Sequence, residues 1–123
     1  MTRPAQSIVY FGVYVVLLGA TLILTPNVLL GVFGFPITSE VWIRVLGIVA
    51  VVLGAYYIVM GRQDVVAFFR ATVIGRIWVF LALSALVIIG LGRPPLVLFG
   101  ALELLGAVWT WRSLRQSSPV IPR

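Results

Sequence analysis

Glu103 is the residue in this sequence best suited to chemistry, because it is the one acidic residue in the middle of a long apolar segment. It follows Pro95 by eight residues, which places it about 12 Å below the surface of a membrane. A lone carboxylate in hydrocarbon is costly, so it should be protonated or paired. Arg44, near one end of another apolar segment, is the expected partner. The pair is interpreted either as a static clamp between two helices, which we favour, or as a site that responds to a proton or a ligand.

A second candidate is a polar stripe on the first apolar segment. At 100° per residue, Tyr10, Tyr14, Thr21 and Thr25 fall within about 60° of one another on a helix. Polar stripes on membrane helices usually face protein or a cavity rather than lipid. If the protein is a transporter or channel, this stripe should line the path, with Glu103 as a gate or proton carrier.

Other kinds of chemistry are disfavoured by what the sequence lacks. There is no histidine or cysteine, and no phosphate-binding glycine loop, pair of acids, or nucleophile with an adjacent base. We therefore expect a protein that is not an enzyme, with no catalytic residues, no metal site and no bound cofactor of its own.

The elements that position these residues are predicted to be four membrane-spanning helices. Of 123 residues, 62% are apolar and only 10% are charged, whereas a soluble domain is about 25% charged. Four segments reach the length of roughly 20 residues that a span needs. They cover about residues 8–25, 41–60, 71–91 and 95–114. The expected fold is all-α: a single membrane domain over residues 1–123, forming a four-helix bundle. The net charge of +6 is attributed to the flanks of the spans and not to nucleic-acid binding.

The arginines predict the orientation. Seven lie on the side shared by both termini and the middle connection, and two lie on the other side. The seven are Arg3, Arg62, Arg70, Arg76, Arg112, Arg115 and Arg123, and the two are Arg44 and Arg93. Because positive charge favours the cytoplasmic side, both termini are expected in the cytoplasm. Arg76, at the start of the third span, is expected to extend to the cytoplasmic surface or to pair with Asp64.

Two connecting segments are expected to lie at the membrane interface. Residues 27–36 are apolar but too short to span, and should lie at the outer surface. Residues 64–70 should form a short cytoplasmic helix, with Asp64 as its N-cap, that leads into the third span.

Glycines mark the faces on which helices should pack closely, because small residues let backbones approach in lipid. They are Gly12 and Gly19 in the first span, Gly47, Gly54 and Gly61 in the second, and Gly100 and Gly106 in the fourth. The glycines of the first span lie opposite its polar stripe, so both faces of that helix are expected to be occupied.

The run WIRVLGIVAVVLGAYY at the start of the second span, PNVLLGVFGF after the first, and the spacing of Arg70 and Arg76 resemble the DoxX-like proteins. These are small four-helix membrane proteins of bacteria. The resemblance implies a location in the bacterial inner membrane. Some members accompany quinone-linked membrane oxidoreductases, which implies an accessory role and transfers no catalytic residue.

The leading functional hypothesis is a non-enzymatic membrane protein that packs as an accessory subunit against a larger complex or against itself. Its expected partners are the lipid bilayer and other membrane subunits, with no nucleic acid. One alternative is a small-solute transporter or channel. The other is a subunit that binds lipid, quinone or another hydrophobic cofactor at its contact surfaces.

Overall fold

The computed structural model describes residues 1–117, and these form five helices and no strand. The helices are α1 (Arg3–Leu24), α2 (Pro26–Val32), α3 (Trp42–Arg62), α4 (Val66–Ile88) and α5 (Pro95–Ser117). The four longer helices are long and apolar enough to cross a membrane. The all-helical class and the number of long apolar helices are therefore confirmed.

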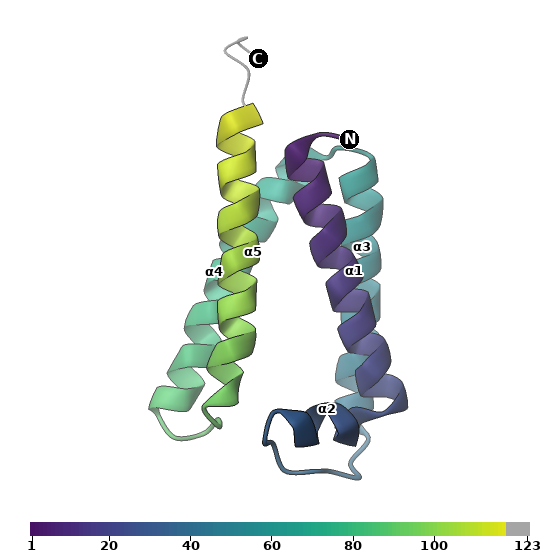
Figure 1. Cartoon of the computed structure of the whole chain (residues 1–123), viewed down its shortest axis with the longest axis vertical. Helices are drawn as coiled ribbons and strands as arrows, with labels where there is room; N and C mark the ends of the chain where they lie inside the picture. Colours follow the sequence, from purple (N-terminus) through teal and green to yellow (C-terminus); the bar gives the residue numbers. More distant parts are fainter. Residues whose placement is uncertain (118–123) are drawn as a thin grey trace.

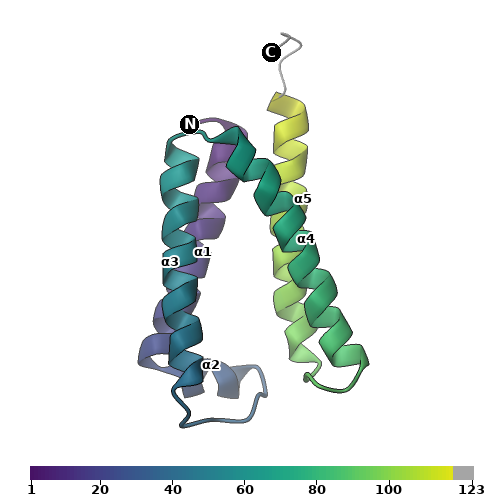
Figure 2. The same ribbon diagram turned by 180° about the vertical axis from the view of Figure 1, so that it is seen from behind.

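The helices form two antiparallel pairs arranged as an inverted V (Figure 1). One pair is α1 with α3 and the other is α4 with α5, and α1 packs on α5 where the pairs meet. Figure 2 shows α4 starting beside the end of α3 and running diagonally to α5. We call the end where α1 begins and α5 ends the terminal end. The opposite end, where the pairs are apart and α2 lies, is the α2 end.

The α1–α3 pair is held by direct contact between glycine backbones. A Cβ at Gly54 would lie 2.7 Å from the carbonyl oxygen of Gly12, and a Cβ at Gly47 would lie 2.7 Å from that of Gly19. Gly61 continues the same face, where a Cβ would lie 2.6 Å from a methyl group of Val9. No larger residue fits at Gly47 or Gly54 without moving a helix backbone, whereas at Gly61 the side chain of Val9 would have to move.

The glycines of α5 face other helices. A Cβ at Gly100 would lie 3.3 Å from the Phe80 ring, on α4. A Cβ at Gly106 would lie 2.8 Å from the Phe11 ring and 3.0 Å from Nη1 of Arg76. Because Gly106 has no side chain, Phe11 of α1 and Arg76 of α4 both fit against it.

Two helices begin earlier than the sequence predicts. Helix α1 starts at Arg3, because the hydroxyl of Thr2 accepts a hydrogen bond from the Ala5 amide at 3.2 Å and caps the helix. Helix α4 starts at Val66 and runs without a break to Ile88. The short helix expected at residues 64–70 is therefore not a separate element: from Val66 it forms the first turn of α4.

Asp64 also differs from its predicted role as an N-cap. Its backbone has a φ of 56°, and it forms the left-handed turn between α3 and α4. Its carboxylate accepts a hydrogen bond from the hydroxyl of Thr2 at 2.9 Å, which ties this turn to the start of α1. The other predicted interfacial segment, residues 27–36, contains most of α2.

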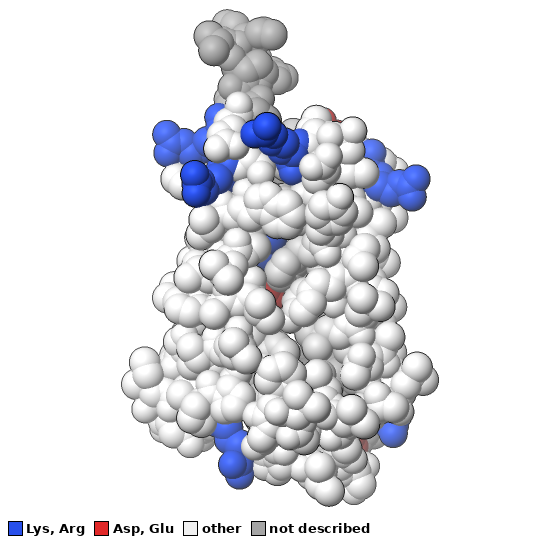
Figure 3. All heavy atoms as spheres, in the orientation of Figure 1, with Lys and Arg blue, Asp and Glu red and all other residues white. Residues whose placement is uncertain are grey.

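The outward faces of the long helices are apolar. Between 17% and 33% of each apolar stretch is buried inside the protein, and many large apolar side chains of these helices are exposed. Figure 3 shows white in the middle of the molecule and most of the blue at the terminal end. Five exposed arginines lie there, at positions 3, 62, 70, 112 and 115, and Arg44 and Arg93 lie at the α2 end. Arg123 lies outside the described residues.

Candidate functional site

A buried arginine on α4 is the centre of the candidate site. Arg76 is 2% exposed and lies ten residues into its helix, about 15 Å from the start. Its Nε donates to the carbonyl oxygen of Thr72 at 3.2 Å, and its Nη2 donates to the hydroxyl of Thr72 at 3.1 Å. The same Nη2 donates to the hydroxyl of Thr110, on α5, at 2.8 Å.

The hydrogen bonds continue from Thr110 to α1. The hydroxyls of Thr110 and Ser7 are 2.8 Å apart, and the Ser7 hydroxyl donates to the carbonyl oxygen of Pro4 at 2.7 Å. Because the proton of Ser7 is used on Pro4, the proton of Thr110 must point to Ser7. The series of hydrogen bonds therefore runs from Arg76 to Thr110, Ser7 and Pro4, and it joins α4, α5 and α1. We call Ser7, Thr72, Arg76 and Thr110 the junction.

Aromatic rings cover the guanidinium of Arg76. Its Cζ lies 4.9 Å from the centre of the Phe11 ring and 5.8 Å from that of Tyr57. Attraction between a cation and the faces of aromatic rings strengthens when water is excluded. The rings come from α1 and α3, so Arg76 contacts both helix pairs.

Two polar atoms near the junction have no partner. Nη1 of Arg76 and Oε2 of Glu103 are buried and make no hydrogen bond within the described part of the chain. The two charges are nevertheless close enough to act on one another. In Figure 3 a small blue area and a small red area are visible in a crevice at mid-height, within the white region. A buried polar atom without a partner costs about 1–3 kcal/mol, so this donor and this acceptor are available to a further group.

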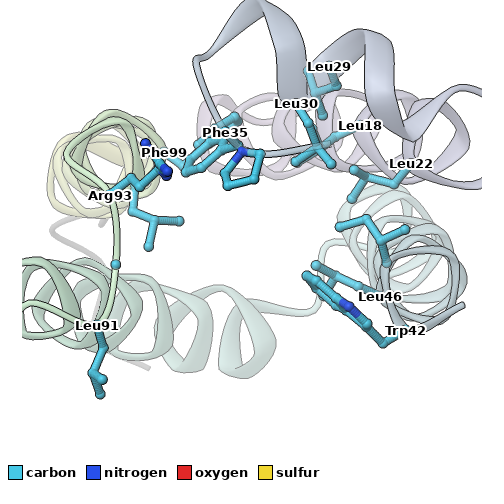
Figure 4. Close-up of a pocket in the computed structure, with 14 residues that line it drawn as sticks. Leu18, Leu22, Leu29, Leu30, Phe35, Trp42, Leu46, Leu91, Arg93 and Phe99 are labelled. Carbon is cyan, nitrogen blue, oxygen red and sulfur yellow. The ribbon is translucent and has the colours of Figure 1, made fainter. Parts of the chain in front are cut away.

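An apolar pocket lies at the α2 end, between the two helix pairs (Figure 4). Its volume is about 490 Å³. Figure 4 shows Phe35 and Phe99 on one side and Trp42 and Leu46 on the other. Arg93, in the turn before α5, is the charged residue in the lining. The remaining lining residues are Leu18, Leu22, Leu29, Leu30, Pro36, Ile43, Leu91, Gly92 and Leu96.

Helix geometry shows where Glu103, whose Oε2 has no partner in the described part of the chain, lies relative to this pocket. Phe99 precedes Glu103 by one turn of α5, and Leu18 follows Tyr14 by one turn of α1. The layer that contains Glu103 therefore lies directly beyond the inner end of the apolar pocket. Side chains on a helix lean toward its N-terminus, and the N-terminus of α5 is at the pocket end.

The expected pairing of Arg44 with Glu103 is not found. Nη1 of Arg44 donates to the carbonyl oxygen of Ile23, at the end of α1, and its side chain is exposed. Arg76 is instead the arginine that lies near Glu103. The reason is the pairing of the helices: α3 packs on α1, whereas α5 packs on α4 and α1.

The predicted polar stripe divides into two parts. Tyr10 stacks on Trp109 of α5 at 5.9 Å, and Tyr14 packs on Phe11 at 5.4 Å between ring centres. The hydroxyl of Thr21 donates to the carbonyl oxygen four residues earlier at 2.9 Å, and Thr25 does the same at 3.5 Å. Tyr10 thus contacts the other helix pair, Tyr14 packs on a ring of its own helix, and the threonines are bonded to their own helix.

Sequence reasoning missed Arg76 as an interior residue. The expectation that it reaches the surface or pairs with Asp64 is wrong, because it is buried and Asp64 bonds to Thr2. A signal was available in the spacing, since Thr72 precedes Arg76 by one helical turn and can satisfy its guanidinium.

Comparisons with protein-family models, with curated proteins and with solved structures found no match to this chain.

Proposed function

We propose that this chain is an integral membrane protein with four spans and with its terminal end in the cytoplasm. The apolar outward faces of the long helices support insertion, because a soluble protein would expose them to water. The excess of exposed arginines at the terminal end supports the orientation. The DoxX-like resemblance supports the inner membrane of a bacterium as its location.

The proposed activity is binding, without catalysis, of a hydrophobic small molecule of the lipid or quinone class. The observation that carries this proposal is the pocket between the helix pairs. Its volume of about 490 Å³ is in the range of small-molecule sites, and its lining is apolar with Arg93 at the outer end. An apolar molecule with one polar end fits this lining better than a small hydrophilic solute does.

An accessory role in a larger membrane complex is the second candidate. The glycines of α1 and α3 pack on one another, so they no longer argue for an outside partner. Support comes instead from the α2 end, where α3 and α4 lie apart (Figure 2), although they contact one another near the turn that joins them through Tyr57 and Phe68. The apolar pocket is bordered by α3 and by the turn after α4, and a helix of another subunit is an alternative occupant.

The test is to fill the pocket. Leu46 lines it and is about half exposed, whereas the adjacent Val45 is equally exposed and does not line it. The variants Leu46→Trp and Val45→Trp are purified in a mild detergent, and bound small molecules are extracted and quantified by mass spectrometry. We expect the wild type and Val45→Trp to retain a stoichiometric hydrophobic molecule and Leu46→Trp to lose at least nine-tenths of it. Equal amounts in both variants would contradict the proposal, and a copurifying subunit lost only from Leu46→Trp would favour the second candidate.

A further inference from the structure

The last turns of α5 are flanked by a groove on each side. On one side, α5 and the start of α1 form a groove of about 490 Å³. On the other side, α5 and α4 form a groove of about 380 Å³. Both lie at the terminal end and are separate from the apolar pocket at the α2 end.

The α1–α5 groove is built for an anion. Arg3 and Arg112 line it, one from each helix, together with the side-chain amides of Gln6 and Gln116. None of the described residues that line it is acidic. Arg3 donates to the Gln116 oxygen at 3.3 Å, which is its one side-chain hydrogen bond within residues 1–117. Guanidinium groups bind phosphate oxygens with two parallel hydrogen bonds, so two arginines across one groove favour a phosphate group.

The inner part of the same groove is apolar. Leu105 and Val108 line it and are 65% and 41% exposed, and Trp109 stands beside them. These residues lie on α5 in the direction of the apolar middle of the molecule. A tryptophan beside arginines at the end of a span is typical of the boundary between headgroups and hydrocarbon. The groove thus offers a charged end to a headgroup and an apolar end to an acyl chain.

The α4–α5 groove repeats this arrangement. Arg70 comes from α4 and Arg115 from α5, and Trp111 and Ile74 line the apolar part. The guanidinium of Arg115 lies 5.0 Å from the Trp111 ring, which holds it at the rim. Each groove therefore combines one arginine of α5, one arginine of a neighbouring helix and one tryptophan of α5.

We infer that the terminal part of α5 binds anionic phospholipids, with one phosphate headgroup in each groove. This inference rests on the proposal that the chain spans a membrane, and it is independent of what occupies the apolar pocket. Zwitterionic lipids also carry a phosphate, but their headgroup brings a positive charge beside the arginines, so they should bind less tightly.

The experiment is native mass spectrometry of the full chain in detergent with an equimolar mixture of phosphatidylglycerol and phosphatidylcholine. We expect up to two bound phosphatidylglycerol molecules. The variant with Arg3→Gln and Arg112→Gln should lose one of them, with affinity falling roughly fivefold for each arginine removed. The variant with Arg70→Gln and Arg115→Gln should lose the other. Arg62→Gln, at the same end but outside both grooves, is the matched control and should keep both.

Three results would overturn the inference. One is equal binding of the two lipids by the wild type, and another is a loss in Arg62→Gln as large as in the groove variants. The third is displacement of the lipid by millimolar inorganic phosphate, which would identify a site for free phosphate. Insertion of the protein into vesicles is tested separately, by carbonate extraction, and does not depend on which lipid binds. Failure of this inference is therefore distinguishable from failure of the membrane proposal.

Discussion

Replacing Thr110 with valine should weaken the contact between the two helix pairs. The Thr110 hydroxyl accepts from Arg76 at 2.8 Å and donates to Ser7 at 2.8 Å, so among the described residues of the junction its side chain is the one hydrogen-bonded to both α4 and α1. Valine keeps the shape of threonine and removes both bonds. Arg76 keeps its bonds to Thr72, so the guanidinium is not left without partners.

The expected loss in the free energy of unfolding follows from the two hydrogen bonds that the variant lacks. A hydrogen bond from a charged donor contributes about 1.5–3 kcal/mol and one between hydroxyls about 0.5–1.5 kcal/mol in water-soluble proteins. Hydrogen bonds between membrane helices average about 0.6 kcal/mol, with a maximum of about 1.7 kcal/mol. We therefore expect Thr110→Val to lower the free energy of unfolding by about 2 kcal/mol, measured by denaturant titration in mixed micelles.

Thr21→Val is the matched control, because the Thr21 hydroxyl bonds to the carbonyl of Leu17 on its own helix and, within residues 1–117, to no other helix. Its effect should stay below about 0.5 kcal/mol, which is typical of positions away from special interactions. Ser7→Ala should be coupled to Thr110→Val, with a double-variant loss at least 0.5 kcal/mol smaller than the sum. Additive losses, or equal effects of the two threonine variants, would refute the reasoning.

Three further predictions concern the packing, the charges and the topology. Gly54→Ala should destabilise the protein by about 1–3 kcal/mol in the same assay, since its Cβ would lie 2.7 Å from a carbonyl oxygen of α1, whereas Gly75→Ala, with nothing within 4 Å, should not. Glu103→Gln and Arg44→Gln should show additive effects on the free energy of unfolding, because the two residues lie on helices that do not pack together. A coupling energy above 0.5 kcal/mol would instead support the ion pair predicted from the sequence. Reporter fusions in the turn at Gly92 and at the C-terminus should report opposite sides of the membrane, and the same side for both would contradict four spans.

The sequence was sufficient to predict the long helices because their apolar lengths and the flanking prolines leave few alternatives. It placed the start of α4 at residue 71, where hydropathy rises, although the helix begins at Val66. That difference of five residues is about 7.5 Å. Because the helix starts earlier, Arg76 lies in the interior of the protein and not at the surface, where it was expected.

The sequence indicates which face of each helix is suited to packing, but it is less informative about which other helix packs against that face. Arg44 and Glu103 both lie on faces with glycines, but a face does not specify which helix packs against it. The glycines of α1 and α3 fit one another backbone to backbone, and this leaves Arg44 beside Ile23. Glu103 then belongs to the other pair, where Arg76 is the nearby cation.

The central claim is that the apolar pocket binds a hydrophobic small molecule, and photo-crosslinking in intact cells tests it most directly. A photoreactive amino acid is placed at Leu96, which lines the pocket, and in parallel at the adjacent Val97, which does not. The account predicts that the purified Leu96 variant carries a discrete added mass from one hydrophobic molecule, and that the Val97 variant carries the mixed adducts of bulk lipid. The same mixture of adducts at both positions would contradict it.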